Sequence, residues 1–166
     1  MNKFIYYLSI LFATTLVAQE RPEVKAIRTN LTIKVDGLLD EEIWENIEPI
    51  TQFIQRLPQD GAQPTEKSEM RIIYDDNYLY FGFTFFDSEP EKVRATILNR
   101  GGWIHRDDKL EIALDTYLDR RNAYLFEMNP LGTQDDALIS DESRPSLDEW
   151  AWDGVYISQG RVTDFG

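Results

Sequence analysis

Apolar and polar residues alternate with a period of two along several short stretches of the chain, which is the pattern of β-strands that bury one face. Clean alternation runs over residues 69–74, 109–115 and 124–129, whereas residues 78–86 form an almost continuously apolar and aromatic run. The continuous run predicts a strand covered on both faces, at the centre of the fold. Residues 75–77, Asp-Asp-Asn, have turn chemistry, so the first stretch and the continuous run are expected to form a β-hairpin.

Three further strands are predicted on weaker patterns, over residues 31–35, 133–139 and 153–159. The segment Asn129-Pro130-Leu131-Gly132 has the residue choices of a type I turn. After the last of these strands, Gly160-Arg161 forms a turn, and the five residues that follow resemble the start of a hairpin partner. Because that partner stops in mid-element, we expect the domain to be incomplete at its C-terminus.

One short helix is predicted over residues 40–47. Acidic residues at its start suit the positive end of the helix dipole, and Ile43, Trp44 and Ile47 form one apolar stripe. Pro49 then ends the helix. Many short strands with turns between them, and almost no helix, are typical of an all-β fold, and we expect an antiparallel β-sandwich with one short helix.

The first residues form a segment of their own. A lysine is followed by an apolar stretch over residues 4–17 and by Ala18-Gln19, which is typical of a secretory signal peptide cleaved after Ala18. We therefore assign residues 1–18 to a signal peptide, 19–30 to an N-terminal linker and 31–166 to the domain. This predicts export to the periplasm, the outer membrane or the extracellular space. A single N-terminal membrane anchor is the alternative.

Composition and charge narrow the classes of function. The chain has 166 residues, with 30 acidic and 17 basic side chains and a formal net charge of −13, so electrostatic binding of nucleic acid is not expected. The absence of cysteine excludes disulfides, thiol nucleophiles and thiolate metal sites, and the single histidine, His105, excludes a site built on paired histidines. With 42% hydrophobic residues the chain is too apolar for a disordered acidic tail.

Polar residues on two predicted strands could bind a sugar. Glu111, Glu127 and Asn129 all lie opposite the apolar positions of their strands, so we expect them side by side on the outer surface. Trp103 follows two glycines in a loop and is expected to be exposed. Carboxylates and amides can bind hydroxyl groups while an aromatic ring covers the apolar face of a pyranose. The alternatives are a sheet face that is merely solvated and, for Trp103, burial in the core.

Acidic pairs in the loops suggest calcium. Asp107-Asp108 and Asp135-Asp136 could supply the carboxylate oxygens that Ca²⁺ prefers, although no EF-hand spacing is present. We predict a structural calcium site from these four residues and no other cofactor. Solvated acidic loops are the alternative explanation.

Three motifs carry a resemblance to a known family. They are residues 35–44 (VDGLLDEEIW), residues 71–80 (RIIYDDNYLY), and Trp103 followed by residues 108–115 (DKLEIALD). Together they resemble the opening signature, the central hairpin and the D-x-x-E strand of family 9 carbohydrate-binding modules. Residues 119–135 look like one branch of that family, the N-terminal module of large outer-membrane-associated Bacteroidota proteins that have an uncharacterised C-terminal domain.

The resemblance implies a β-sandwich that holds the end of a sugar between two tryptophans, with polar side chains on the hydroxyls and structural calcium ions. Trp103 matches one of the tryptophans and Glu111 one of the polar contacts. Glu127 stands where sugar-binding members carry a basic residue on the next strand. The family's second tryptophan lies beyond residue 166.

The main hypothesis is therefore a non-catalytic, exported carbohydrate-binding module that serves polysaccharide degradation. Its partner would be a glycan or oligosaccharide, bound by Trp103, Glu111, Glu127 and Asn129. The alternative is a structural or interaction domain without sugar binding, packed against a C-terminal outer-membrane domain. A third hypothesis is a glycoside hydrolase, which would need two carboxylates about 5 to 10 Å apart.

Overall fold

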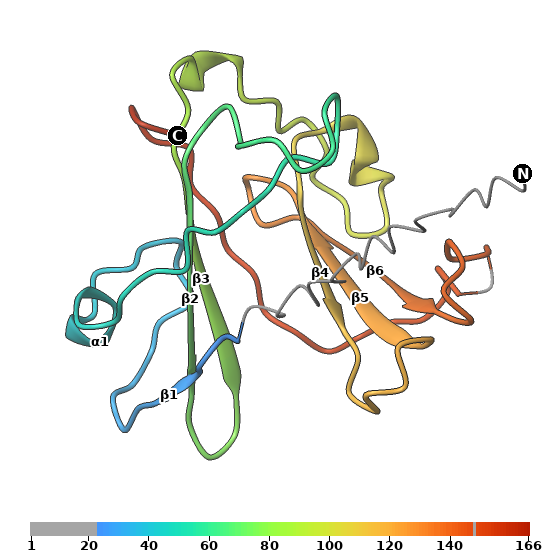
Figure 1. The fold of residues 1–166 in the computed structure, drawn as a ribbon, viewed down its shortest axis with the longest axis horizontal. Coiled ribbons are helices and arrows are strands. Elements are labelled where there is room, and N and C mark those ends of the chain that lie inside the picture. Colours follow the sequence, from blue (N-terminus) through green and yellow to red (C-terminus); the bar gives the residue numbers. More distant parts are fainter. Residues whose placement is uncertain (1–22, 148) are drawn as a thin grey trace, which may run out of the picture.

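Two small β-sheets form most of the regular structure in the computed structural model, which describes residues 23–147 and 149–166 (Figure 1). Each sheet has three strands, in the orders β1-β2-β3 and β4-β5-β6, and each occupies its own half of the molecule. One short α-helix, α1, lies beside the first sheet. The predicted all-β fold class is confirmed. The predicted signal peptide, residues 1–18, lies outside the described residues.

The described elements follow one another as β1 (Ile27–Arg28), α1 (Glu42–Glu45), β2 (Ser68–Tyr74), β3 (Leu79–Phe85), the 3₁₀ turns η1 (Pro90–Lys92) and η2 (Ile104–Arg106), β4 (Leu110–Leu114), β5 (Ala123–Met128) and β6 (Gln134–Ile139). All strand pairs are antiparallel except β1 with β2.

The predicted hairpin is formed by β2 and β3. The two strands pair antiparallel over all seven residues of each. At the turn, Asp75 Oδ1 accepts the backbone N–H of Asn77 at 2.7 Å and that of Tyr78 at 2.8 Å. A short acidic side chain that folds back onto its own backbone in this way stabilises a turn locally, which is why the sequence signal is reliable here.

β1 pairs in parallel with β2 and forms one edge of the first sheet. The alternation pattern does not predict this pair. β1 falls inside the predicted linker, residues 19–30, so part of that linker belongs to the sheet. The strand predicted over residues 31–35 is absent. Its backbone leads instead to the start of α1, where the N–H of Lys34 donates to the Glu41 carboxylate at 2.8 Å.

β3 lies at the opposite edge of its sheet, so the prediction that it is the centre of the fold is wrong. One of its faces is closely covered, since a Cβ on Gly82 would lie 2.9 Å from Leu39 and 3.0 Å from Trp44. The ends of the strand are open, with Leu79 50% and Phe85 45% exposed. Aromatic residues on both faces produce a continuous apolar run even though the strand is not buried on both sides.

The second sheet contains the three strands that alternation predicts in this part of the chain. β5 is the middle strand and pairs with β4 on one side and β6 on the other. The predicted turn between β5 and β6 is confirmed, because the N–H of Gly132 donates to the carbonyl of Asn129 at 2.8 Å. Gly132 has a φ of 81°, a left-handed conformation that glycine adopts without steric cost.

A C-terminal strap, residues 152–166, runs from the second sheet to the first (Figure 1). The strand and hairpin predicted there are absent. Residues 153–159 are held by hydrogen bonds that involve side chains, and the few backbone bonds of the strap, such as that from the N–H of Asp87 to the carbonyl of Phe165, form no ladder. Tyr156 Oη lies 2.8 Å from the carbonyl of Glu127, and Arg161 Nε donates to the carbonyl of Asp36 at 2.9 Å. The strap therefore ties the two halves of the molecule together.

Deeply buried apolar side chains occur in both halves. Trp44 of α1 and Ile73 of β2 lie in one half, and Ile104, Leu125 and Ala137 lie in the other. Burial of Trp44 agrees with the apolar stripe predicted for the helix. Within residues 23–147 and 149–166, no helix combines the length and apolar character needed to cross a membrane.

Trp44→Ala should lower the free energy of unfolding by about 3 to 5 kcal/mol, because it leaves a cavity against Gly82 where a side chain only 4% exposed was packed. Ile54 is 67% exposed, so Ile54→Ala is the matched control and should stay within about 0.5 kcal/mol of wild type. Denaturant unfolding followed by circular dichroism measures both. Equal losses in the two variants would contradict this packing.

Candidate functional site

Three carboxylates lie side by side across the second sheet. The register places Glu111 of β4 opposite Glu127 of β5, and Glu127 opposite Asp135 of β6. Residues directly opposite in antiparallel strands share a face of the sheet. This carboxylate row, Glu111, Glu127 and Asp135, confirms that Glu111 and Glu127 are neighbours. It adds Asp135, which was predicted only as a calcium ligand.

Lys109 stabilises the carboxylate row. Its Nζ lies 2.5 Å from Glu111 Oε1 and 2.7 Å from Glu127 Oε1. Glu111 is exposed, but Glu127 is only 3% exposed, which contradicts the expectation that it lies on the outer surface. A carboxylate at that depth needs a partner, and the lysine supplies it. The spacing Lys109-x-Glu111 is the signal in the sequence that could have revealed this ion pair, because residues two apart on a strand share a face.

The two glutamates differ in how readily they hold a proton. Burial raises the pKa of Glu127 to about 7; the hydrogen bond from Lys109 opposes this shift and the neighbouring Glu111 carboxyl adds to it. The hydrogen bond from Lys109 lowers the pKa of Glu111. Burial also raises the pKa of Asp135. At neutral pH the ionised Glu111 therefore stays paired with Lys109, while Glu127 is partly protonated.

Trp103 is the N-cap residue of η2 and presents its ring to solvent. It is 64% exposed, which agrees with the predicted loop position, and its ring centroid lies 5.2 Å from that of His105. Its backbone has a φ of 62°, in the left-handed region that costs an L-residue roughly 1 to 2 kcal/mol. A bulky residue in this conformation is uncommon.

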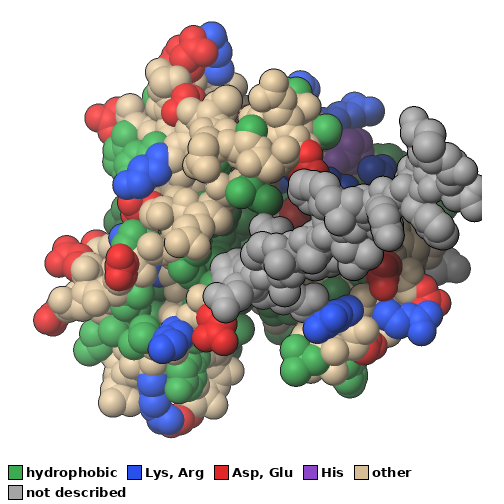
Figure 2. Space-filling model, in the orientation of Figure 1, with side chains coloured by type: hydrophobic (Ala, Val, Ile, Leu, Met, Phe, Trp, Pro, Cys, Tyr) green, Lys and Arg blue, Asp and Glu red, His purple; other side chains and the backbone are tan. Residues whose placement is uncertain are grey.

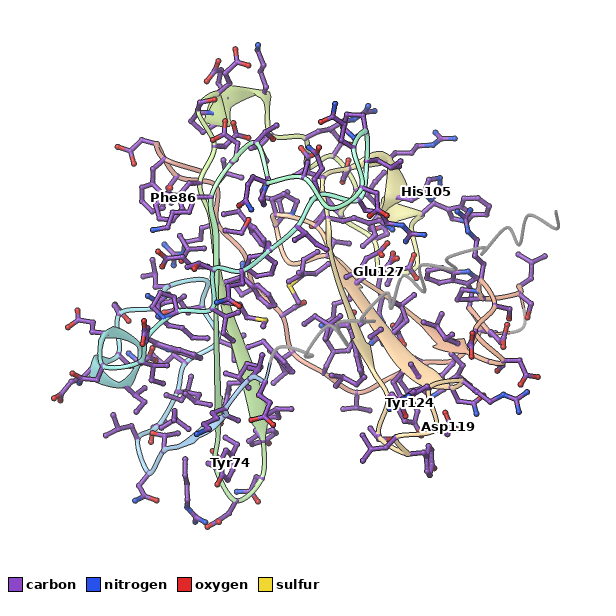
Figure 3. The ribbon with its side chains drawn as sticks, viewed as in Figure 1. Tyr74, Phe86, His105, Asp119, Tyr124 and Glu127 are labelled. Atoms are coloured by element: carbon purple, nitrogen blue, oxygen red, sulfur yellow. The ribbon has the colours of Figure 1, made fainter. Side chains whose placement is uncertain are left out.

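The loop that carries Trp103 is anchored at one end of the carboxylate row. The N–H of Gly101 donates to the carbonyl of Gln134 at 3.1 Å, one residue before Asp135. Figure 3 shows His105 and Glu127 toward the same end of the second sheet. Figure 2 shows His105 at the surface among basic side chains. The Trp103 loop is therefore held at the Asp135 end of the row.

Asn129 is a structural residue in this geometry. It is only 2% exposed, and its side-chain oxygen accepts the N–H groups of Leu131 and Thr133 at 3.1 and 2.9 Å. Its amide nitrogen donates to the carbonyl of Ile97 at 2.8 Å and to Asp107 Oδ2 at 3.0 Å. The prediction that it lies on the outer surface is therefore wrong, because both ends of its amide are used inside the protein.

Asp107 and Asn129 form a buried brace, joined by the hydrogen bond between their side chains. Asp107 also binds the loop around Ile97. Oδ2 also accepts the N–H groups of Thr96 and Ile97, each at 2.9 Å, and Oδ1 accepts the Thr96 hydroxyl at 2.7 Å. Desolvation by itself would raise its pKa, but the hydrogen bonds from Ile97, Asn129 and Thr96 outweigh it and lower the pKa to about 2. Because Asp107 directly follows η2, the brace holds the segment that carries Trp103.

The four predicted calcium ligands do not converge. Asp107 is saturated by its own protein donors, and Asp108 accepts the N–H of Arg94 at 2.7 Å. Asp136 accepts Arg100 at 2.8 Å and the N–H of Gly154 at 2.5 Å, on the opposite face of β6 from Asp135. No group of three acidic or histidine side chains within the described residues could hold a metal ion. These donors do not fit a shared calcium site, and calcium elsewhere on the chain stays a prediction.

A shallow depression adjoins the Trp103 loop. Its volume is about 300 Å³, and its lining includes Arg100, Thr133, Gln134 and Ser158. The N–H of Gly101 donates to the carbonyl of Gln134 at 3.1 Å, which fixes the loop to the rim. The lining is mostly polar, so the depression extends the hydrogen-bonding surface beyond the tryptophan. Sequence patterning did not identify Arg100, because its position depends on the fold of the whole loop.

Comparison with known proteins gives one match. A family model described as "Carbohydrate family 9 binding domain-like" matches residues 35–143, about two thirds of the chain. No curated protein and no solved structure matches. The matched residues include Trp103, all of the carboxylate row and Lys109.

Asp107→Asn should make the free energy of unfolding depend less on pH in the acid range. The pKa of Asp107 falls from an ordinary 3.8 to about 2, so its contribution to stability is present above pH 3.8 and is lost as pH falls through 2. Wild type should lose about 2 kcal/mol more than the isosteric variant between pH 4 and 2. Urea unfolding across this range measures the difference, and parallel curves for the two proteins would contradict the assignment.

Glu127→Gln should make the folded protein lose less stability than wild type as pH rises from 5 to 8. Because the folded pKa of Glu127 is raised from 4.5 to about 7, its favourable contribution is complete below pH 4.5 and is lost as pH rises through 7. Relative to the variant, wild type should lose on the order of 1 to 3 kcal/mol between pH 5 and 8. Thermal melting across that range tests this. Glu91→Gln, on the exposed 3₁₀ turn η1 and away from the row, is the control and should melt in parallel with wild type across that range.

Proposed function

The chain belongs to the carbohydrate family 9 binding domain-like family, and from this we propose that it is a non-catalytic module that binds glycan with the face formed by Trp103 and the carboxylate row. The observation that carries the proposal is the state of Trp103. Its indole ring is 64% exposed and its backbone is left-handed. Folding alone favours a buried ring and a glycine at such a position, and strain of this kind concentrates at functional sites.

The ring suits one face of a sugar. The C–H groups of a pyranose form an apolar surface that an aromatic ring covers well, and an exposed tryptophan provides a large, rigid platform. The ring contact with His105 limits the orientations of the indole. The brace formed by Asp107 and Asn129 holds its loop. Trp103 is therefore ready to stack without first being ordered by the ligand, which reduces the entropy cost of binding.

The neighbouring polar groups suit the hydroxyls of the same sugar. Glu111 and Asp135 can accept hydrogen bonds, and Lys109 can donate one. Glu127 is too deeply buried to be a first choice for contact, and its part in the proposal is to hold Lys109 in place. This modifies the expectation that Glu127 and Asn129 touch the sugar themselves.

Binding without hydrolysis follows from the arrangement of the acids. A glycosidase needs two carboxyl groups on opposite sides of the scissile bond, with room for a sugar and, in inverting enzymes, a water molecule. Glu111 and Glu127 instead hold the same lysine amine, and Glu127 is shielded from solvent. The raised pKa of Glu127 is explained by burial beside Glu111 without any catalytic role.

The setting we propose is an exported one. The pattern of residues 1–18 is that of a secretory signal peptide, and an acidic module of this kind fits the periplasm, the outer membrane or the cell exterior. Attachment to an outer-membrane domain in a longer protein, as in the branch that the motifs resemble, belongs to the same proposal.

Trp103→Ala should weaken glycan binding at least about thirty-fold, since removing a central aromatic contact costs about 2 kcal/mol or more. Isothermal titration calorimetry with a panel of neutral mono- and oligosaccharides measures the affinity. Tyr117 is 74% exposed on the loop between β4 and β5, and Tyr117→Ala is the matched aromatic control, expected to bind as wild type does.

A second variant separates binding from folding. Trp103→Gly accepts the left-handed backbone, so its stability should be equal to or up to about 1 kcal/mol above that of wild type while binding is lost. A folded wild-type protein that binds no sugar in the panel would favour the structural or interaction domain instead. Release of reducing sugar by wild type, abolished in Glu111→Gln, would overturn the non-catalytic assignment.

A further inference from the structure

Basic residues concentrate in the segment that carries the exposed tryptophan. Residues 92–106 contain four lysines and arginines and the only histidine, but no acidic residue, in a chain that has 30 acidic residues. No other acid-free run after residue 20 is as long. Trp103 lies inside this run and is the most exposed of the four tryptophans. The chain is therefore basic at the place where its ring is offered to a ligand.

Two arginines of this run are held on neighbouring segments without a carboxylate partner. The N–H of Asp108 donates to the carbonyl of Arg94 at 2.9 Å, which joins the segment of Arg94 to the end of η2, where Arg106 lies. Both arginines are exposed, and among the described residues neither takes part in an ion pair. Arg100 and Lys109, by contrast, each pair with two carboxylates. Arg94 and Arg106 can therefore bind an anion from outside the chain.

The acidic residues that follow η2 are already engaged by protein donors. Asp107 is 7% exposed and is saturated by the brace. Asp108 accepts the backbone N–H of Arg94. Acidic groups farther away act weakly on this surface, because charges more than about 8 Å apart are largely screened at physiological ionic strength. The surface at η2 therefore keeps an excess of positive charge, although the whole chain is acidic.

The cationic groups of η2 adjoin the ring of Trp103. The ring centroids of Trp103 and His105 lie 5.2 Å apart, and Arg106 is the next residue. Figure 2 shows His105 at the surface among basic side chains. A pyranose stacked on an indole projects its exocyclic groups past the edge of the ring, so a substituent on this side meets the imidazole and the guanidinium. The planar fork of an arginine matches the oxygens of a carboxylate or a sulfate.

We propose that the preferred ligand of the Trp103 face is an acidic glycan, whose sugar carries a carboxylate or sulfate group bound by His105 and Arg106. This inference rests on the proposed glycan binding and names its substrate class. The carboxylate row repels such a group, whereas η2 attracts it. The sugar is therefore oriented with its hydroxyl edge over the row and its charged edge over η2.

Matched sugars test the substrate class. Isothermal titration calorimetry at low ionic strength compares the methyl glycosides of glucose, galactose and mannose with the corresponding uronic acids and 6-sulfates. The charged sugars should bind at least about tenfold more tightly than the neutral ones, and added salt should reduce this difference. Sodium sulfate is the control for an anion without a sugar, and it should bind much more weakly than the sugar sulfates.

The outcomes separate this inference from the proposed function. Equal affinity for charged and neutral sugars would overturn the inference and leave glycan binding in place. Sodium sulfate that binds as tightly as the sugar sulfates would also overturn it, because the site would then recognise the anion alone. If the folded protein binds none of these sugars, both the inference and the proposed function are wrong.

Arg106→Gln is the decisive variant. It should reduce the ratio of affinities for charged over neutral sugars at least about tenfold, because it removes the charged fork. Arg106 is exposed, so the variant should melt as wild type does. Arg120 is exposed on the loop that follows β4, at the other end of the sheet, and Arg120→Gln is the matched control that should keep the ratio. A ratio that survives Arg106→Gln, or that falls equally in both variants, would contradict the assignment of Arg106.

Discussion

The hydrogen bond between Asp107 and Asn129 is the contact on which the geometry of the candidate site depends. It joins the residue that follows η2 to the first residue of the turn after β5, and both side chains also hold the backbone at Ile97. Asp107 and Asn129 are both buried, so removing either side chain would leave polar groups of the other without a partner. The brace offsets the strain of the left-handed Trp103, because its hydrogen bonds fix the loop in a conformation that the tryptophan alone would not favour.

A second constraint is the cost of burying Glu127. A carboxylate at that depth is tolerated only with a partner, and Lys109 reaches it while also pairing with the exposed Glu111. When Glu127 holds its proton, Lys109 and Glu111 balance one another and the pair of strands carries almost no net charge. On β4 and β5 the surface proposed for the sugar therefore offers hydrogen-bond acceptors whose charge is balanced by Lys109. Such a surface suits neutral hydroxyl groups, although the chain as a whole is strongly acidic.

Local signals were enough to predict the hairpin of β2 and β3 and the three strands of the second sheet. Alternation fixes which side chains share a face, and Asp75 closes its turn with bonds to the next few residues. Contacts between distant segments were not predictable in this way. The burial of Asn129 depends on a loop some thirty residues earlier in the chain folding over it. The pairing of β1 depends on β2, far along the sequence, and the alternation of residues 153–159 looks like a strand although the bonds there come from side chains.

The strap is the physical link between the proposed binding face on the second sheet and the end of β3 in the first sheet. Tyr156 places its hydroxyl against the carbonyls of Glu127 and Asp135, at 2.8 and 2.9 Å, directly beneath the carboxylate row. Its ring packs edge-on against Phe126, with centroids 5.0 Å apart. At its other end the same segment supplies Phe165 to the strand edge. The strap is therefore fixed at both ends by contacts to different sheets, and the side-chain bonds of its first half stabilise it where a backbone ladder is absent.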